Sequence, residues 1–416
     1  MKIVTFGGAL GLAAALVASA PRTAQAQVSD SLYNELKRIG QIVDPACTAK
    51  AMRPLMPAND YNTWWAPGAP APDPSKAKLY PGVTITRDQK FGANAKDLVD
   101  IFTADNKGSG KTVFMWVPGG GGNKIEQQVR EDNAFYDNIG RWGVKNGMVV
   151  VTVQRHPGQA WDDGGRDIAN AVDWVHDNIA QYGGDPNKIV MGAHSAGTGP
   201  TSVYVGHPER WPHGVQIKGM VYMSGGAYAG NYPGAPPPAA AGRGNAPAPG
   251  AQPAGAACGS TAAQNGAEGA ISGPSGATPP PARGAGPGGP GAGGPGGGRG
   301  AAPQLTDAER AERDNWPAFS KTPVHLMFVR AELDPGVMGD MTANDKGMHE
   351  ALCATEGPKA KDGEGRCPVL LYAKRNSHMS EVFSFDSPDK TVSDPILQFV
   401  KNAVKAVKED KRVATK

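Results

Sequence analysis

The strongest candidate for a reactive side chain is a serine in a run of small residues, Gly192-Ala193-His194-Ser195-Ala196-Gly197. The run stands where a predicted buried strand, residues 188–192, passes into a predicted helix. A strand that turns sharply into a helix brings two backbones into near contact, so small residues are needed on both sides, and the strain exposes the serine hydroxyl. The common form of this elbow is Gly-x-Ser-x-Gly, and Ala193 replaces the first glycine. Ser195 is therefore a candidate nucleophile.

A glycine run, Pro118-Gly119-Gly120-Gly121-Gly122, directly follows a predicted strand that ends at Val117. Consecutive glycines let backbone N–H groups turn toward a developing oxyanion, which a side chain would obstruct. A glycine loop without function is the alternative. A nucleotide site is disfavoured, because the run contains neither Gly-x-Gly-x-x-Gly nor Gly-Lys-Ser/Thr.

Two carboxylates and a histidine follow later strands. Glu332 and Asp334 come just after the predicted strand 324–329, and His378 lies in the loop after the next strand. Open α/β sheets gather their ligand sites at the carboxyl ends of the strands. Serine, then acid, then histidine is the chain order of one hydrolase architecture. Asp334 is preferred as the acid because the residue before a proline is extended and the chain must leave the strand there, and Glu332 stays as the alternative.

The elements that would position these residues alternate between strands and helices. Strands are predicted at 83–86, 98–102, 112–117, 148–153, 188–192, 217–223, 324–329 and 369–372, and helices at 135–144, 162–182, 197–205, 306–315, 342–353 and 395–407. The first two strands are predicted to be antiparallel. The alternation that follows implies right-handed crossovers, and therefore an α/β fold with a mostly parallel sheet covered by helices on both faces.

Three of these segments carry a resemblance to a known family. The segment 163–197, with Tyr182-Gly-Gly-Asp-Pro186 and His194-Ser-Ala-Gly197, resembles the α/β-hydrolase superfamily, especially its carboxylesterase and hormone-sensitive-lipase-like branches. Pro118 to Gly121 is similar to the His-Gly-Gly-Gly oxyanion loop of these proteins, with proline at the histidine position. Ala331-Glu-Leu-Asp-Pro335 is similar to their acid-bearing segment. The resemblance covers roughly 83–223 and 323–407, and it implies the α/β-hydrolase fold.

The resemblance also implies roles for individual residues. Ser195 would be the nucleophile, His378 the general base and then acid, and Asp334 the group that orients the imidazole. Three backbone N–H groups are implied to form the oxyanion hole, those of Gly120, Gly121 and Ala196. The implied reaction is hydrolysis of a small-molecule or polymeric carboxylic ester through an acyl-enzyme, with no metal or organic cofactor. A serine peptidase or acyltransferase could use the same residues, and a non-catalytic binding protein is a further alternative.

Three further residues are candidates for the substrate pocket. His156 ends a central strand, and Trp64 and Trp65 form an aromatic pair ahead of the first strand. A structural role is the alternative for each of them.

The chain has 416 residues, of which 57 are Gly and 37 are Pro. Residues 1–26 are expected to be a signal peptide, with an apolar run before Ala24-Gln25-Ala26; an uncleaved membrane anchor is the alternative. Residues 27–82 are expected to be irregular. Residues 83–232 and 304–416 would form one α/β-hydrolase domain. Residues 233–303, mostly Gly, Pro and Ala, would be a disordered insert, because they offer little apolar surface to offset the entropy of ordering.

Charge and cysteine content complete the expectations. Lys and Arg number 42 against 39 Asp and Glu, so nucleic acid is not an expected partner. No membrane span is expected once the signal peptide is removed, and an exported protein, periplasmic or secreted, is predicted. Four cysteines suit two disulfides in such a protein. Cys353 and Cys367 flank one loop and are the preferred pair, which leaves Cys47 for Cys258, although free thiols remain the alternative.

Overall fold

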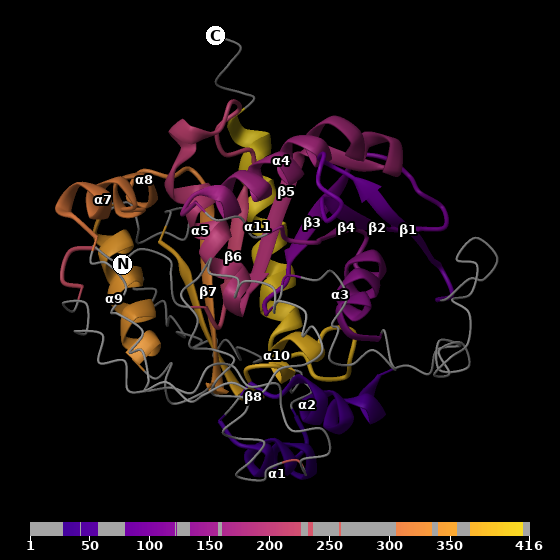
Figure 1. Cartoon of the computed structure of the whole chain (residues 1–416). Helices are drawn as coiled ribbons and strands as arrows, with labels where there is room; N and C mark the ends of the chain where they lie inside the picture. The colour runs from indigo at the N-terminus through magenta and orange to yellow at the C-terminus, as the bar shows by residue number, and fades with distance from the viewer. Residues whose placement is uncertain are drawn as a thin grey trace, which may run out of the picture.

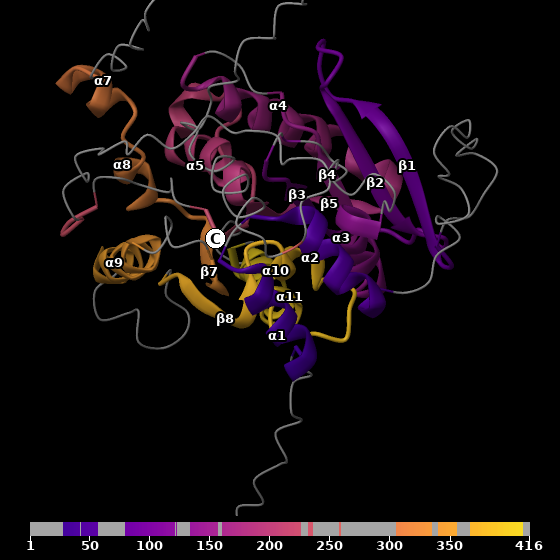
Figure 2. The same cartoon turned by 60° about the horizontal axis from the view of Figure 1, so that its bottom comes forward.

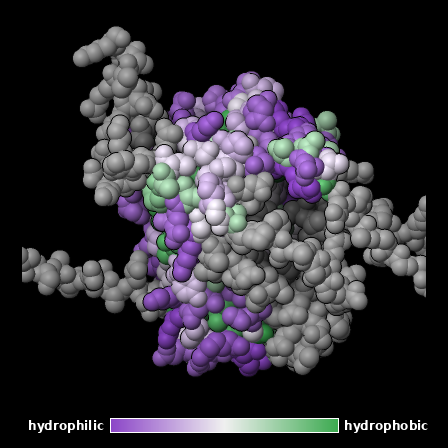
Figure 3. Space-filling view, turned by 90° about the vertical axis from the view of Figure 1, so that its left-hand side faces the viewer, coloured by the Kyte–Doolittle hydropathy of each residue, from purple (hydrophilic) through white to green (hydrophobic). Residues whose placement is uncertain are grey.

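A computed structural model describes residues 28–41, 43–56, 80–120, 122, 134–156, 160–225, 232–235, 258, 305–334, 340–355 and 367–410 (Figure 1). The expected signal peptide, most of the expected insert, and the candidates Trp64, Trp65 and Gly121 lie outside these residues. In the part of the chain that the structure describes, no helix is both long and apolar enough to cross a membrane. Among the coloured residues of the face seen in Figure 3, hydrophobic residues form small separate patches between hydrophilic ones.

The centre of the fold is an eight-stranded sheet with the order β1-β2-β4-β3-β5-β6-β7-β8. Its strands are β1 (Val83–Lys90), β2 (Leu98–Ala104), β3 (Lys111–Val117), β4 (Val149–Val153), β5 (Gly184–His194), β6 (Gly219–Met223), β7 (His325–Leu333) and β8 (Val369–Ser377). β2 pairs antiparallel with both β1 and β4, and every other pair is parallel. The predicted α/β fold with a mostly parallel sheet is therefore confirmed.

The helices lie on both faces of this sheet. They are α1 (Asp30–Ile39), α2 (Pro45–Met52), α3 (Ala134–Lys145), α4 (Asp163–Asn178), α5 (Thr198–Gly206), α7 (Asp307–Glu312), α8 (Trp316–Phe319), α9 (Asp340–Thr355), α10 (Ser380–Phe383) and α11 (Ser393–Asp410). Short 3-10 helices are η1 (Arg53–Leu55), η4 (Ile179–Tyr182), η5 (Ser195–Gly197) and η6 (Pro208–Arg210).

Alternate side chains along the strands point to opposite faces of the sheet and form two hydrophobic cores. On β3, Phe114 and Trp116 face the core shared with α3, α10 and α11, whereas Val113, Met115 and Val117 face the core shared with α4, α5 and α8. Successive side chains of a strand point to opposite faces. Both faces are therefore covered, and the carboxyl ends of the parallel strands are left to build a site.

The segment 27–82 was expected to be irregular, and this expectation is wrong for its first part. Ser29 accepts a hydrogen bond from the backbone N–H of Leu32 and caps α1, whose buried Leu32, Leu36 and Ile39 share one face. This cap and the spacing of four and then three residues are ordinary signals of an amphipathic helix. Figure 1 places α1 and α2 below β8 and α10, and Figure 2 brings them to the front.

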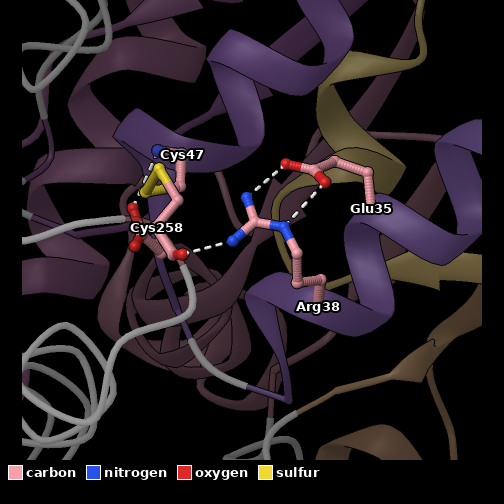
Figure 4. Close-up of a disulfide and its surroundings, with 5 residues drawn as sticks. Glu35, Arg38, Cys47 and Cys258 are labelled. Atoms are coloured by element: carbon pink, nitrogen blue, oxygen red, sulfur yellow. Dashed lines mark hydrogen bonds and ion pairs between the residues drawn. A yellow bond between two sulfur atoms is a disulfide. The ribbon is translucent and has the colours of Figure 1, made fainter.

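Two disulfides are formed, Cys353–Cys367 and Cys47–Cys258. In Figure 4, Arg38 of α1 donates one hydrogen bond to the carbonyl oxygen of Cys258 and others to Glu35. Cys258 belongs to the segment expected to be a disordered insert. The structure attaches this residue to α2, so the insert is anchored at that point.

Replacing Cys47 and Cys258 by serine should lower the melting temperature. The bond joins residues 211 apart, and the chain-entropy model gives about 5 kcal/mol for a loop of that length, which corresponds to roughly 10 °C or more in a domain of this size. Thermal unfolding monitored by circular dichroism without reductant measures the change. The matched control replaces Cys353 and Cys367, only 14 residues apart, and should lose less. A larger loss in the control would contradict the anchoring role of Cys258.

Candidate active site

Ser195 occupies a strained turn between β5 and α5. Its φ is 50°, a left-handed conformation that non-glycine residues rarely adopt. A Cβ on Gly197 would lie 2.6 Å from the carbonyl oxygen of Pro118, so a larger residue cannot stand two positions after the serine. Thr198 Oγ1 donates a 2.7 Å hydrogen bond to the carbonyl oxygen of Ser195 and fixes the turn. This local geometry is the one that the elbow motif predicted.

The alanine before this turn also has a steric explanation. A Cβ on Gly192 would lie 2.8 Å from the Phe114 ring. On the strand side of the serine, the position that requires glycine is therefore Gly192 and not Ala193. Ala193 is buried and its side chain is accommodated in the core shared with α4 and α5. The departure from Gly-x-Ser-x-Gly therefore leaves the elbow intact.

Asp334 and His378 meet at the carboxyl ends of β7 and β8. His378 Nδ1 lies 2.9 Å from Asp334 Oδ1. The other carboxylate oxygen, Oδ2, accepts hydrogen bonds from Ser224 Oγ at 2.6 Å and Arg330 Nη1 at 3.2 Å. The aspartate is therefore held on both oxygens, and one of them faces the imidazole.

Glu332 points elsewhere. Its Oε1 accepts a 2.8 Å hydrogen bond from the Tyr33 hydroxyl, and its Oε2 accepts one at 2.6 Å from the backbone N–H of Arg375. These contacts join α1 to the β7–β8 edge of the sheet. Of the two carboxylates left open by the sequence, Asp334 is the one that contacts His378.

The environment keeps Asp334 ionised. Burial alone would raise its pKa, but the hydrogen bond to His378 and the charge of Arg330 lower the pKa below its ordinary value. Arg330 in turn pairs with the buried Asp345. An ionised carboxylate on Nδ1 holds the imidazole with Nε2 as its basic nitrogen.

His378 Nε2 is buried and, among the described residues, has no hydrogen-bond partner. His194, the neighbour of Ser195 in the chain, connects the two regions: its ring centroid is 4.6 Å from that of His378, and its Nε2 donates a 2.8 Å hydrogen bond to the His378 carbonyl oxygen. Ser195 and His378 are not hydrogen-bonded to each other. Such contacts are often long in enzymes without substrate.

The glycine loop passes directly beside the serine, because a Cβ on Gly119 would lie 2.9 Å from Ser195 Cβ. Arg155, just after β4, donates hydrogen bonds to three successive loop carbonyls: Nε to Pro118 at 2.9 Å, and Nη2 to Gly119 at 3.2 Å and Gly120 at 2.7 Å. In a trans peptide the N–H points away from the C=O. The N–H groups of Gly119 and Gly120 therefore face away from Arg155.

Arg155 was not identified from the sequence, although it holds this loop in shape. It is 9% exposed, and burial lowers its pKa to about 10, so it remains charged at neutral pH. A Cβ on Gly122 would lie 2.7 Å from Arg155 Cβ, so this fourth glycine is required by the arginine. Its position directly after a central parallel strand is the one signal that the sequence offers.

Glu381 is a second residue that the sequence analysis missed. It is fully buried on α10, its Oε1 lies 3.6 Å from His194 Nε2, and within the described residues neither carboxyl oxygen has a hydrogen-bond partner. Burial and then the negative charge of Asp334 raise the pKa of Glu381 well above its ordinary value. Burial and the charge of His378 lower the pKa of His194 well below its ordinary value. His194 is therefore neutral at neutral pH, and Glu381 keeps its proton to a higher pH than an ordinary glutamate does.

Glu381→Gln should retain activity and gain stability as the pH rises. A carboxyl whose pKa is raised by folding costs stability above its unfolded value, 4.5, because the unfolded chain then releases a proton that the folded chain keeps. The melting temperature of the Gln variant, relative to wild type, should therefore increase from about pH 4.5 toward neutrality. Melting curves across pH measure this.

Glu332→Gln is the matched control with the opposite sign. The hydrogen bond from the Arg375 backbone lowers the pKa of Glu332 despite some burial, so the carboxylate stabilises the fold above pH 4.5 and its loss should lower the melting temperature there. Equal pH dependence in the two variants would show that Glu381 is ionised in the folded protein.

The remaining candidates are distributed as follows. Ala196 lies on the exposed turn after Ser195, and Gly120 is also exposed. His156 is half-buried beside Asn94, Asp97 and Asp167, and its Nε2 is 2.9 Å from the Asn94 side-chain amide. The structure thus brings Gly119 against Ser195 and Asp334 against His378, and His194 links the two pairs. His156 lies in a separate polar cluster.

The sheet order, with a strained serine after β5, an acid after β7 and a histidine after β8, is that of the α/β-hydrolase fold. Residues 163–236 match a family model described as the carboxylesterase family. Rat liver carboxylesterase 1F is 28% identical over 196 residues, covering 41% of this chain and 34% of the relative. Secreted lipase 5 of Gibberella zeae is 30% identical over 132 residues, covering 28% of this chain and 23% of the relative.

Among solved structures, carboxyl esterase 2 of the fungus Tuber melanosporum is similar with a TM-score of 0.48 and 14% identity, covering 88% of this chain and 98% of that one. The chain spans about a third or less of the length of the curated relatives it matches. The fold is that of the α/β-hydrolases, and residues 163–236 are similar to the carboxylesterase family.

Proposed function

We propose that this protein is a serine esterase that hydrolyses carboxylic esters through an acyl-enzyme on Ser195. The observation that carries the proposal is the 2.9 Å contact between Asp334 and His378. The other imidazole nitrogen has no hydrogen-bond partner among the described residues, and the ring contacts His194, the residue before the strained Ser195. The match of residues 163–236 to the carboxylesterase family supports the same chemistry.

In the proposed reaction, Ser195 Oγ attacks the ester carbonyl carbon while His378 Nε2 takes the hydroxyl proton. Asp334 stabilises the imidazolium through its bond to Nδ1. The tetrahedral oxyanion is bound by the proposed N–H donors, those of Gly120, Gly121 and Ala196. His378 then gives its proton to the leaving alcohol oxygen, which leaves the acyl group on Ser195. A water molecule, deprotonated by His378, attacks that acyl carbon and releases the acid.

We further propose that the protein works outside the cytoplasm, in the periplasm or as a secreted enzyme. The two disulfides support this location, because such bonds persist mainly in oxidising compartments. The signal-peptide pattern in residues 1–26 supports it as well.

A substrate panel tests the proposed reaction on purified, oxidised protein. Release of p-nitrophenol from acyl esters of increasing chain length should be catalysed, with feruloylated esters and aminoacyl anilides compared in the same buffer. Ester turnover that exceeds anilide turnover is the expected result. Faster cleavage of anilides would favour a peptidase, and faster transfer to an added alcohol than to water would favour an acyltransferase.

A further inference from the structure

A second cluster of chemically competent side chains lies apart from the proposed catalytic residues. Asp97 stands in the loop between β1 and β2, His156 follows β4, and Asp167 is on α4. One ligand atom from each of the three lies within 4.8 Å of the other two. Three elements distant in sequence thus bring two carboxylates and an imidazole to one point.

Asp97 and Asp167 are buried, and few charged groups of the described chain lie close enough to offset the cost of burying their carboxylates. Asp97 is 8% exposed and Asp167 is 7% exposed. His156 Nδ1 lies 3.6 Å from Asp97 Oδ1, beyond hydrogen-bond distance. The neighbouring Arg155 uses its side chain on the glycine-loop carbonyls instead. Buried carboxylates are normally paired or bound to a metal.

Asp97 Oδ1 is buried and has no hydrogen-bond partner in the described part of the chain. Other atoms of the cluster have close contacts. Asp97 Oδ2 accepts from the backbone N–H of Asn94 at 2.7 Å, the Asn94 side-chain amide contacts His156 Nε2 at 2.9 Å, and Asp167 Oδ2 accepts from the backbone N–H of His156 at 2.7 Å. The two backbone N–H groups that donate to Asp97 and Asp167 hold these carboxylates in place, as outer hydrogen bonds hold metal ligands in proteins.

We propose that Asp97, His156 and Asp167 bind a single divalent metal ion of the zinc type. Imidazole with carboxylates suits Zn²⁺ better than Ca²⁺, which prefers oxygen ligands alone. Bonds of about 2.1 Å place tetrahedral ligands roughly 3.4 Å apart, so small side-chain rotations close the site. His156 Nδ1 and Asp97 Oδ1 supply two of the ligands. The half-exposed imidazole leaves a route for the ion and a position for water.

A metal ion at this site would restrain the glycine loop indirectly, through Arg155. His156 directly follows Arg155, which holds three carbonyls of that loop. An ion that joins His156 to α4 and to the β1–β2 loop would restrict the backbone of Arg155. The resemblance in sequence implied no metal, so this ion would be structural, separate from the proposed acyl transfer, and the proposal does not depend on the esterase activity.

Calorimetric titration of the full, oxidised protein with ZnCl₂ after EDTA treatment and dialysis tests the proposal. One ion should bind per chain, and Ca²⁺ should bind at least tenfold more weakly. At a hundredfold excess over Kd the melting temperature should rise by on the order of 5 °C. Asp97→Asn, His156→Gln and Asp167→Asn should each weaken Zn²⁺ binding more than tenfold. Melting curves of the metal-free variants show whether each one is folded.

Two controls separate this site from other metal-binding groups. Asp173→Asn alters another Asp–His contact, His213 Nδ1 to Asp173 Oδ2 at 3.1 Å, and should leave the affinity unchanged. His349→Gln alters the histidine beside the Cys353–Cys367 disulfide and should also leave it unchanged. Absence of binding to wild type, binding retained in all three site variants, or binding lost in His349→Gln would each overturn the proposal.

Discussion

Ser195→Ala is expected to lower ester turnover by several orders of magnitude, on the order of 10⁶ when the nucleophile of a complete triad is removed. No acyl-enzyme can form without the hydroxyl, and only oxyanion binding and substrate positioning remain. The turnover number with a p-nitrophenyl ester, measured at saturating substrate, gives the loss directly.

The fold should survive this substitution. Ser195 is half-buried, and the hydrogen bond of the turn is made by its carbonyl oxygen with Thr198, which alanine retains. The melting temperature should therefore stay within a few degrees of wild type. A folded Ser195→Ala variant with near-normal turnover would exclude Ser195 as the nucleophile.

Asp334→Asn is expected to lower turnover by about 10⁴, as loss of the acid does in triads of this kind. Asparagine preserves the shape of the side chain but cannot stabilise the imidazolium, and its amide can hold the imidazole in the wrong tautomer.

Glu332→Gln is the control for this change and should cost far less turnover. Glu332 contacts Tyr33 and the Arg375 backbone, so its effect should fall on stability. If Glu332→Gln lost more turnover than Asp334→Asn, the roles of the two carboxylates would have to be exchanged.

The sheet was largely predictable because its signals are local. Each predicted strand corresponds to an observed one, and the stripe Ile168, Val172 and Val175 forms the buried face of α4. Several boundaries differ. β5 begins at Gly184, inside a segment predicted to be a turn, because Gly184 pairs with Lys111 before a register shift. α1 was missed, since the many prolines of the surrounding segment obscured a short capped helix.

The candidate site was predictable where chain order and strand ends define it, as for Ser195, Asp334 and His378. Arg155 and Glu381 could not be identified in this way. Arg155 acts on backbone carbonyls, which have no sequence signature, and Glu381 is unusual only because tertiary packing buries it without a hydrogen-bond partner among the described residues. The pairing of Cys47 with Cys258 likewise depends on a contact between segments 211 residues apart.

Labelling with a fluorophosphonate tests the central claim most directly. Wild-type protein should take up one equivalent of the probe, and peptide mass mapping should locate it on Ser195, because a serine nucleophile activated by an imidazole base attacks phosphorus as it would an ester carbonyl. Ser195→Ala should remain unlabelled under the same conditions. Labelling of the variant at the wild-type rate, or a modified peptide in wild type that lacks Ser195, would contradict the account.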